Sequence, residues 1–175
     1  MVNIVKPLAR IDPAHFSRVM GRFATGVTII VADVAGDTRG MTANAFMSGS
    51  LEPPLCVVSV AKRAHMHAHL SAAERFSVNV LAAGQEDLAT HFAGRPVPGL
   101  EVAFDDVSTV PAIGSTAATV VAQVAAGHDC GDHTIFIGRI ISMTAHDRPP
   151  LVYHASRFAA LVPLRDEAPS LPEFW

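Results

Sequence analysis

TAATVVAQVAAGHDCGDHTIFIGRIISMTA, residues 116–145, places two runs rich in β-branched residues on either side of the turn-rich GHDCGD. Val, Ile and Thr favour strands, whereas Gly and Asp favour the turn between them. Strands joined by so short a connection pair antiparallel, because a parallel crossover needs about a dozen residues or more. The stretch therefore predicts a long antiparallel hairpin.

Similar strand patterns occur on both sides of this hairpin. Each is bounded by Gly, Pro or Asp, and they occupy residues 26–33, 40–46, 55–60, 75–81 and 149–154. The connections between them are mostly too short for parallel crossovers. The count of six or seven strands with two or three short helices predicts a mainly β fold, an antiparallel barrel with flanking short helices.

Two helix patterns accompany the strands. Asp12 can cap a helix that has Pro13 at its first position, and this helix is expected to end near Gly26. A second short helix is predicted over residues 84–93, with Phe92 on its packed side. The apolar positions of the first helix recur at the spacing of one helix face: Phe16, Val19, Met20 and Phe23.

Length and composition predict a single domain over residues 1–175. Half of the residues are hydrophobic and 17% are charged, so we expect some apolar surface to be buried between subunits. No apolar run approaches the ~18 residues of a membrane span and no secretory segment is visible, so a cytoplasmic protein without membrane contact is expected. A net charge of −3 without a basic run argues against nucleic acid as a partner.

Familiar catalytic motifs are missing from the sequence. It contains neither GxGxxG, nor a phosphate-binding GxxxxGK[ST], nor GxSxG. His65, His67 and His69 would share one face of a strand, but their alternation with Ala and Met favours a helix, on which only His65 and His69 do so. Further ligands cannot be assigned and Cys56 and Cys130 stand alone, so no metal site is expected.

GMTANAFMSGSLEPPL, residues 40–55, is more informative about a ligand. It surrounds Phe46 with small residues and with hydroxyl or amide groups on Thr42, Asn44, Ser48 and Ser50. Small residues let a flat ligand approach the backbone, whose N–H and C=O groups can then bind its polar edge. The alternative is a hairpin whose polar face is only solvated.

Six ordered stretches resemble one known family. They are GRFATGVTIIVA, GMTANAFMSGSLEPPLCVVSV, RFSVNVL, QEDLATHFAG, GDHTIFIGRI and LVYHASRFAAL. Together they resemble the flavin reductase-like domain of the FMN-binding split-barrel superfamily, the reductase component of two-component flavin-dependent monooxygenases. The resemblance covers a core of about residues 12–161. It implies a six-stranded antiparallel Greek-key split barrel and a homodimer with sites at the subunit interface.

The resemblance also implies an activity, which is reduction of FMN or FAD by NADH or NADPH and transfer of the reduced flavin to a separate oxygenase. The flavin performs the redox chemistry, and the protein supplies position and electrostatics. Two alternatives stay open. Some members of the family reduce a cobalt corrinoid of the cob(II)yrinate type, and a non-catalytic flavin-binding barrel would carry the same motifs.

Residue by residue, the resemblance implies a flavin site. Thr42, Ala43, Asn44 and Ser48 would line the isoalloxazine, and Ser59, Val60, Ala61 and Lys62 would follow the ribityl chain toward a phosphate bound by Lys62 and Arg63. Phe92 would pack at the ring, or serve only as a helix core residue. Arg157 and Phe158 would approach from the last segment, with Arg157 otherwise a surface charge.

The resemblance implies that His133 in GDH faces the flavin and the nicotinamide, which makes it the one catalytic candidate. Because neighbours on a strand point to opposite faces, Asp132 and His133 are not expected to form a direct pair. Asp132 is expected to accept backbone N–H bonds in the turn. The alternative for His133 is packing at the barrel mouth. Residues 162–175 are expected to form an extended acidic tail, anchored on a partner subunit by Phe174 and Trp175 or frayed.

Overall fold

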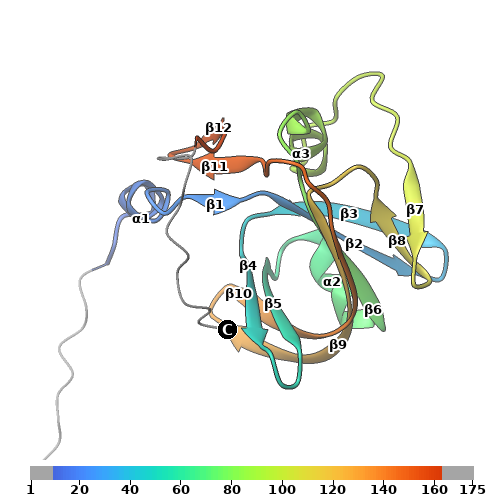
Figure 1. The fold of residues 1–175 in the computed structure, drawn as a ribbon. Helices are drawn as coiled ribbons and strands as arrows, with labels where there is room; N and C mark the ends of the chain where they lie inside the picture. Colours follow the sequence, from blue (N-terminus) through green and yellow to red (C-terminus); the bar gives the residue numbers. More distant parts are fainter. Residues whose placement is uncertain (1–9, 163–175) are drawn as a thin grey trace, which may run out of the picture.

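The computed structural model describes residues 10–162, in a mainly β fold with three short helices (Figure 1). The tail expected over residues 162–175, with its two aromatic anchors, lies outside the described residues beyond Val162. No helix within the described range is long and apolar enough to cross a membrane.

The main sheet contains seven strands in the order β3-β2-β6-β9-β10-β5-β4, and every pairing is antiparallel. The hairpin predicted from residues 116–145 is β9–β10, whose strands have 13 residues each and form the longest pairing in the sheet. The strands are β2 (Thr28–Val34), β3 (Asp37–Ala43), β4 (Phe46–Ser50), β5 (Leu55–Ala61), β6 (Arg75–Val80), β9 (Ala118–Cys130) and β10 (His133–Ala145).

The seven strands of this sheet agree with the six or seven that the sequence patterns predict, and they exceed the six that the resemblance implies. The stretch predicted as one strand over residues 40–46 belongs to two, because β3 ends at Ala43 and β4 begins at Phe46. These two strands are the edges of the sheet, and the observed pairing does not join one edge to the other. Between them, the Ala45 carbonyl accepts a hydrogen bond of 3.0 Å from the Ser59 N–H, which holds the crossing from β3 to β4 against β5.

Two smaller sheets complete the described fold. One pairs β1 (Thr25–Gly26), β11 (Val152–His154) and β12 (Arg157–Ala159). The strand predicted over residues 149–154 contains β11, and β12 is a second short strand that follows it. The other is the hairpin of β7 (Phe104–Val107) and β8 (Val110–Ile113), which the sequence patterns did not predict.

Helix α1 (Pro13–Met20) begins as predicted. The Asp12 carboxylate accepts a hydrogen bond of 2.8 Å from the His15 N–H. The helix ends at Met20, with Gly21 as its C-cap, so the expected end near Gly26 was wrong. None of its residues is buried, and it stands away from the body of the molecule (Figure 1).

Helix α2 (His65–Ala72) confirms the helical interpretation of the histidine-rich segment and buries Met66 and Leu70. His67 Nε2 lies 2.8 Å from Thr134 Oγ1, whereas His65 is exposed. Within residues 10–162, no group of three or more His, Cys, Asp or Glu side chains is arranged to hold a metal ion.

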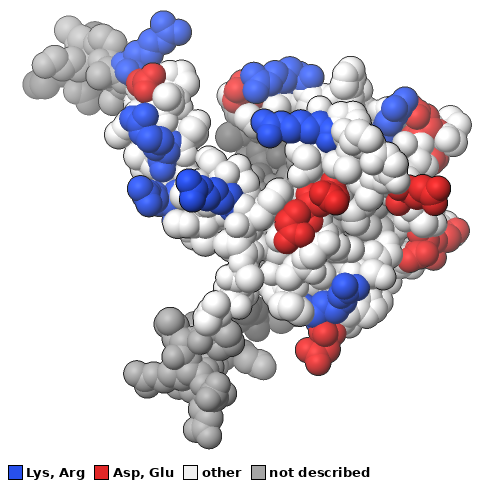
Figure 2. Space-filling view, turned by 90° about the horizontal axis from the view of Figure 1, so that it is seen from above, with Lys and Arg blue, Asp and Glu red and all other residues white. Residues whose placement is uncertain are grey.

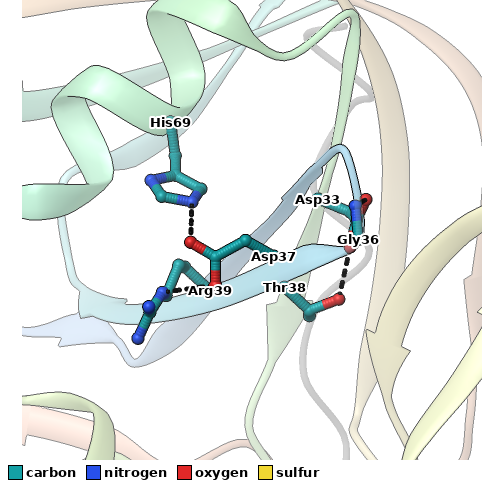
Figure 3. A network of polar contacts seen from close by, with 6 residues as sticks. All are labelled: Asp33, Gly36, Asp37, Thr38, Arg39 and His69. Atoms are coloured by element: carbon teal, nitrogen blue, oxygen red, sulfur yellow. Dashed lines mark hydrogen bonds and ion pairs between the residues drawn. The ribbon is translucent and has the colours of Figure 1, made fainter.

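Polar contacts tie α2 to the β2–β3 hairpin (Figure 3). The Asp37 carboxylate lies 3.2 Å from His69 Nε2 and 2.9 Å from Arg39 Nε. In the turn itself, Asp33 accepts hydrogen bonds from the Thr38 hydroxyl at 2.6 Å and from the Gly36 N–H at 2.9 Å. These hydrogen bonds, that of Thr38 first, lower the pKa of the Asp33 carboxyl.

Strand β2 separates two apolar clusters. Ile30 and Ala32 face the larger cluster, which includes Phe76, whereas Ile29 and Val31 face a smaller one. A strand that is buried on both faces has a nearly continuous run of apolar residues, which explains the sequence TIIVA at residues 28–32. Helix α3 (Glu86–Phe92) packs on the smaller cluster through Ala89.

Candidate functional site

A cavity of about 570 Å³ opens between β3, α3 and the β11–β12 hairpin. Its size falls within the ~300–1,000 Å³ that ligand pockets commonly have. Its walls combine backbone, aromatic rings and two arginines. The lining residues are Val27, Thr42, Ala43, Asn44, Ala89, Thr90, Ala93, Arg95, Tyr153, Ser156, Arg157 and Phe158.

The β3 wall is held in place by hydroxyl groups. The Thr42 hydroxyl donates a hydrogen bond of 2.7 Å to the Ala89 carbonyl on α3, and the Thr28 hydroxyl donates one of 2.7 Å to the Ala43 carbonyl. The Thr42 oxygen therefore keeps only its acceptor capacity for a ligand. The backbone beside it is fixed before any ligand binds.

The opposing wall is the tight turn between β11 and β12. Ala155 and Ser156 have φ values of 48° and 64°, as a two-residue type I′ turn requires. The Ala155 N–H donates a hydrogen bond of 2.8 Å to the Gly21 carbonyl, which attaches the turn to the end of α1. Tyr153 and Phe158 meet edge to face across the hairpin, with ring centroids 5.8 Å apart.

The third wall is the C-terminal end of α3. The Gly94 N–H donates to the His91 carbonyl at 3.2 Å and the Arg95 N–H to the Thr90 carbonyl at 3.3 Å. With Gly94 at φ +83°, these two bonds form a Schellman motif. This motif brings Arg95 to the cavity, a residue that the sequence analysis missed. The signal was the glycine after the helix pattern, which predicts where the next side chain leaves the helix end.

A second group of predicted residues lies where β5 ends against the β9–β10 turn. Ala61 pairs with His133 in the sheet, and the Lys62 N–H donates a hydrogen bond of 2.9 Å to the Asp132 carbonyl. Lys62 Nζ lies 3.1 Å from Asp129 Oδ1. Arg63 is exposed beside this turn, and after His133, which is the main cause, its charge adds to the lowering of the Asp132 pKa.

Asp132 and His133 form a direct pair, so the expectation that they point apart was wrong. Asp132 Oδ1 lies 2.7 Å from His133 Nδ1. The alternation of a strand does not apply, because Asp132 belongs to the turn and β10 begins at His133. The hydrogen bond to His133 is the main cause of the lowered pKa of the Asp132 carboxyl.

Ser59 of β5 links the cavity residues with the group at the β9–β10 turn. Its N–H donates a hydrogen bond to the carbonyl of Ala45, the residue that follows Asn44 of the cavity wall. Ser48 is exposed on β4 opposite Cys56 and does not line the cavity. The side chain of Val60 is fully buried in the larger cluster, so only its backbone is available to a ligand.

Phe92 packs on Gly40 of β3 and does not line the cavity. A Cβ added at Gly40 of β3 would come within 2.5 Å of the Phe92 ring, so the glycine allows the ring to lie directly on the strand. Of the predicted site residues, the cavity therefore brings together Thr42, Ala43, Asn44, Arg157 and Phe158.

The residues around the cavity fit a flavin by their chemistry. Aromatic rings and the β3 backbone offer faces for a flat heterocycle with a polar edge. Arg95 and Arg157 suit phosphate groups. Figure 2 shows basic side chains on both sides of the hollow between the part of the molecule that carries α1 and the rest.

The sequence model of a protein family, the flavin reductase like domain, matches residues 20–161 of this chain. The chain belongs to this flavin reductase family. One relative, the NADH-dependent flavin reductase of Rhodococcus sp, is 37% identical over 161 residues, which cover 90% of this chain and 92% of the relative.

Two further members of the flavin reductase family are informative. The reductase component of 4-hydroxyphenylacetate 3-monooxygenase from Thermus thermophilus is 38% identical over 148 residues, covering 84% of this chain and 95% of the relative. The structure of the flavin reductase PheA2 in its native state superposes with a TM-score of 0.85 at 35% identity, covering 87% of this chain and all of the other.

Proposed function

We propose that this protein is an NADH-dependent flavin reductase that accepts FMN or FAD as the flavin. The observation that carries the proposal is the cavity walled by Thr42, Ala43 and Asn44, in a chain of the flavin reductase family. The Rhodococcus relative bears the same activity in its name. NADPH is the alternative nicotinamide substrate.

The flavin ring is assigned to the cavity, against the backbone of Thr42–Asn44 at the end of β3 and beside Phe158. When bound, the flavin supplies the redox chemistry by accepting a hydride at N5 from nicotinamide C4. Ser48 and Ser59 extend the site toward β5, where the backbone of Val60 and Ala61 leads to Lys62 and Arg63 as phosphate ligands. This path is supported by the hydrogen bond from Ser59 to Ala45.

The remaining residues are assigned to positioning and to the nicotinamide. Phe92 supports the β3 wall through its contact with Gly40. His133 is assigned to the nicotinamide as the catalytic residue, with Asp132 holding its ring. Arg157 contributes positive charge at the hairpin wall.

The physiological acceptor is assigned as a separate oxygenase component that receives reduced flavin. The name of the Thermus thermophilus relative, a reductase component of a monooxygenase, supports this partner. The protein is further assigned as a single cytoplasmic domain over residues 1–175 that forms a homodimer. A six-stranded split barrel, in which β3 and β4 count as one interrupted strand, is supported by the short two-residue connection between these two edge strands.

The activity is tested by oxidation of NADH and NADPH with FMN, FAD and riboflavin in turn, followed by absorbance at limiting protein. We expect flavin-dependent oxidation of NADH and bleaching of the flavin when oxygen is excluded. A folded sample that binds flavin but bleaches it with neither nicotinamide would identify an inert flavin-binding barrel instead.

A further inference from the structure

Arg95 is a cavity cation to which the proposed function gives no specific partner. It lines the same cavity as Arg157, but the two come from different walls, the α3 end and the β11–β12 hairpin (Figure 1). In the part of the chain that the structure describes, neither guanidinium forms an ion pair with a carboxylate. The cavity thus holds two positive charges that would attract an anionic group.

The backbone of Arg95 is fixed on both sides. The Schellman motif holds it on the N-terminal side, and the ring of Pro96 restricts the chain after it. The Val97 N–H then donates a hydrogen bond of 3.2 Å to His91 Nδ1, which returns the chain to α3. Arg95 is exposed, so its side chain is free to orient toward an anion while its backbone stays fixed.

We propose that Arg95 and Arg157 form an anion site for the diphosphate of NADH, an inference that rests on the proposed function. A guanidinium donates two parallel hydrogen bonds to phosphate oxygens, and two guanidinium groups match the two negative charges of a diphosphate. With FMN as the flavin, the proposed function assigns its single phosphate to Lys62 and Arg63, neither of which lines this cavity. The cavity arginines are therefore left for the other phosphate-bearing substrate.

Binding without turnover tests the site directly. NADH is titrated into flavin-free protein and followed by its fluorescence, for the wild type, Arg95→Gln and Arg95→Lys. We expect Arg95→Gln to weaken NADH binding by about 5- to 30-fold, a range that allows for solvent screening of an exposed cation. The NADH affinity of Arg95→Lys should lie between those of the wild type and Arg95→Gln, because lysine keeps the charge but lacks the planar guanidinium. Arg139→Gln, at an exposed position of β10 outside the cavity, is the matched control and should bind as the wild type does.

Kinetics with substrates that lack phosphate separate the possible sources of the anion. With 1-benzyl-1,4-dihydronicotinamide as hydride donor, Arg95→Gln should match the wild type, whereas its KM for NADH should rise. The KM for FMN and for riboflavin should not change. Thermal unfolding of each variant confirms that it is folded.

Three results would overturn the proposal. Equal losses with NADH and with the benzyl compound would indicate a structural role, and a KM increase for FMN but not riboflavin would assign the arginines to the flavin phosphate. Unchanged binding and unchanged KM for NADH would remove any anion role. Failure of the proposed function is distinguishable, because wild-type protein would then oxidise neither nicotinamide with any flavin.

Discussion

At Asp132 the chain is still in the turn between β9 and β10, so its carboxylate reaches the ring of the next residue. The lowered pKa keeps this carboxylate ionised at neutral pH, where it accepts a hydrogen bond from His133 Nδ1–H. His133 Nε2 is then left for a ligand. The pair thereby sets the orientation of the ring in the role assigned to His133.

His133→Ala is expected to lower kcat/KM for NADH by about 5- to 150-fold through the loss of one hydrogen bond, and to leave FMN affinity nearly unchanged. Asp132→Ala should act in the same direction but less strongly, because it removes only the support of the ring. The double variant should be no worse than His133→Ala alone. Anaerobic stopped-flow reduction and flavin titration measure these effects, and additive losses would show that the two residues act independently.

The two cysteines are expected to differ sharply in reactivity. Burial raises the pKa of the Cys56 thiol to about 11, whereas Cys130 is exposed at the end of β9. Since the thiolate is the reactive form, iodoacetamide at about pH 8 should modify Cys130 and spare Cys56 in the folded protein. Peptide mass mapping checks this, and unfolding in urea should expose both thiols. Equal labelling rates in the folded state would contradict the burial of Cys56.

At the scale of elements, the turn between β11 and β12 is the clearest place where backbone strain lies beside the cavity. Ala155 has a φ of 48°, a left-handed conformation that costs a residue with a Cβ about 1–2 kcal/mol. Asn tolerates this region better than other non-glycine residues. The hairpin that carries Arg157 is therefore built on a turn that its sequence does not favour.

Ala155→Asn should stabilise the protein by about 0.5–1 kcal/mol, because it relieves part of this strain. Ala155→Val is the matched control and should destabilise it, since a β-branched residue is least tolerated at positive φ. Thermal unfolding of the two variants against the wild type measures both effects. If both variants unfold at the wild-type temperature, the turn is not strained in the folded protein.

The sequence predicted the elements whose signals are local. The runs that form β2, β5, β6 and β9–β10 carry their own β-branched patterns, and Asp12 with Pro13 marked the start of α1. The β7–β8 hairpin carries no such pattern. It is held by buried polar groups of β6: the Ser77 hydroxyl donates to the Pro111 carbonyl at 2.6 Å, and Asn79 Oδ1 accepts from the Ile113 N–H at 2.9 Å.

The candidate site divides in the same way. The small residues at 42–44 predict a ligand-binding stretch, because a ligand can reach the backbone only where side chains are small. Arg95 could not be distinguished from a solvated loop charge, because its place in the cavity depends on the Schellman motif and on a hairpin about 60 residues later in the chain. Periodicity also misplaced the end of α1, since Phe23 continues the apolar spacing after Gly21 has ended the helix.

At the scale of the whole molecule, α1 and the three-stranded sheet of β1, β11 and β12 form an arm beside the main sheet (Figure 1). Within the arm, the hydrogen bond from the Ala155 N–H to the Gly21 carbonyl joins α1 to the small sheet, yet no residue of α1 is buried. On α1, Phe16 and Met20 are each 56% exposed. Apolar side chains gathered in this way on one exposed element usually mark an interface.

We expect the apolar side of α1 to be covered by a second copy of the chain, so that light scattering gives twice the chain mass of 18.5 kDa at micromolar concentration. Phe16→Glu places a charge in the centre of that interface and should shift the protein toward monomer, because an unpaired charge is costly to bury. Ala14→Glu, at an exposed position on the opposite side of the helix, is the matched control and should stay dimeric.

The two variants also connect assembly with the site, because the arm carries the hairpin that forms one cavity wall. If the dimer contact steadies the arm, Phe16→Glu should weaken flavin binding in parallel with dissociation, and raising the protein concentration should restore both together. A wild-type monomer that binds flavin tightly would show that the cavity is complete in one chain and that the apolar side of α1 has another purpose.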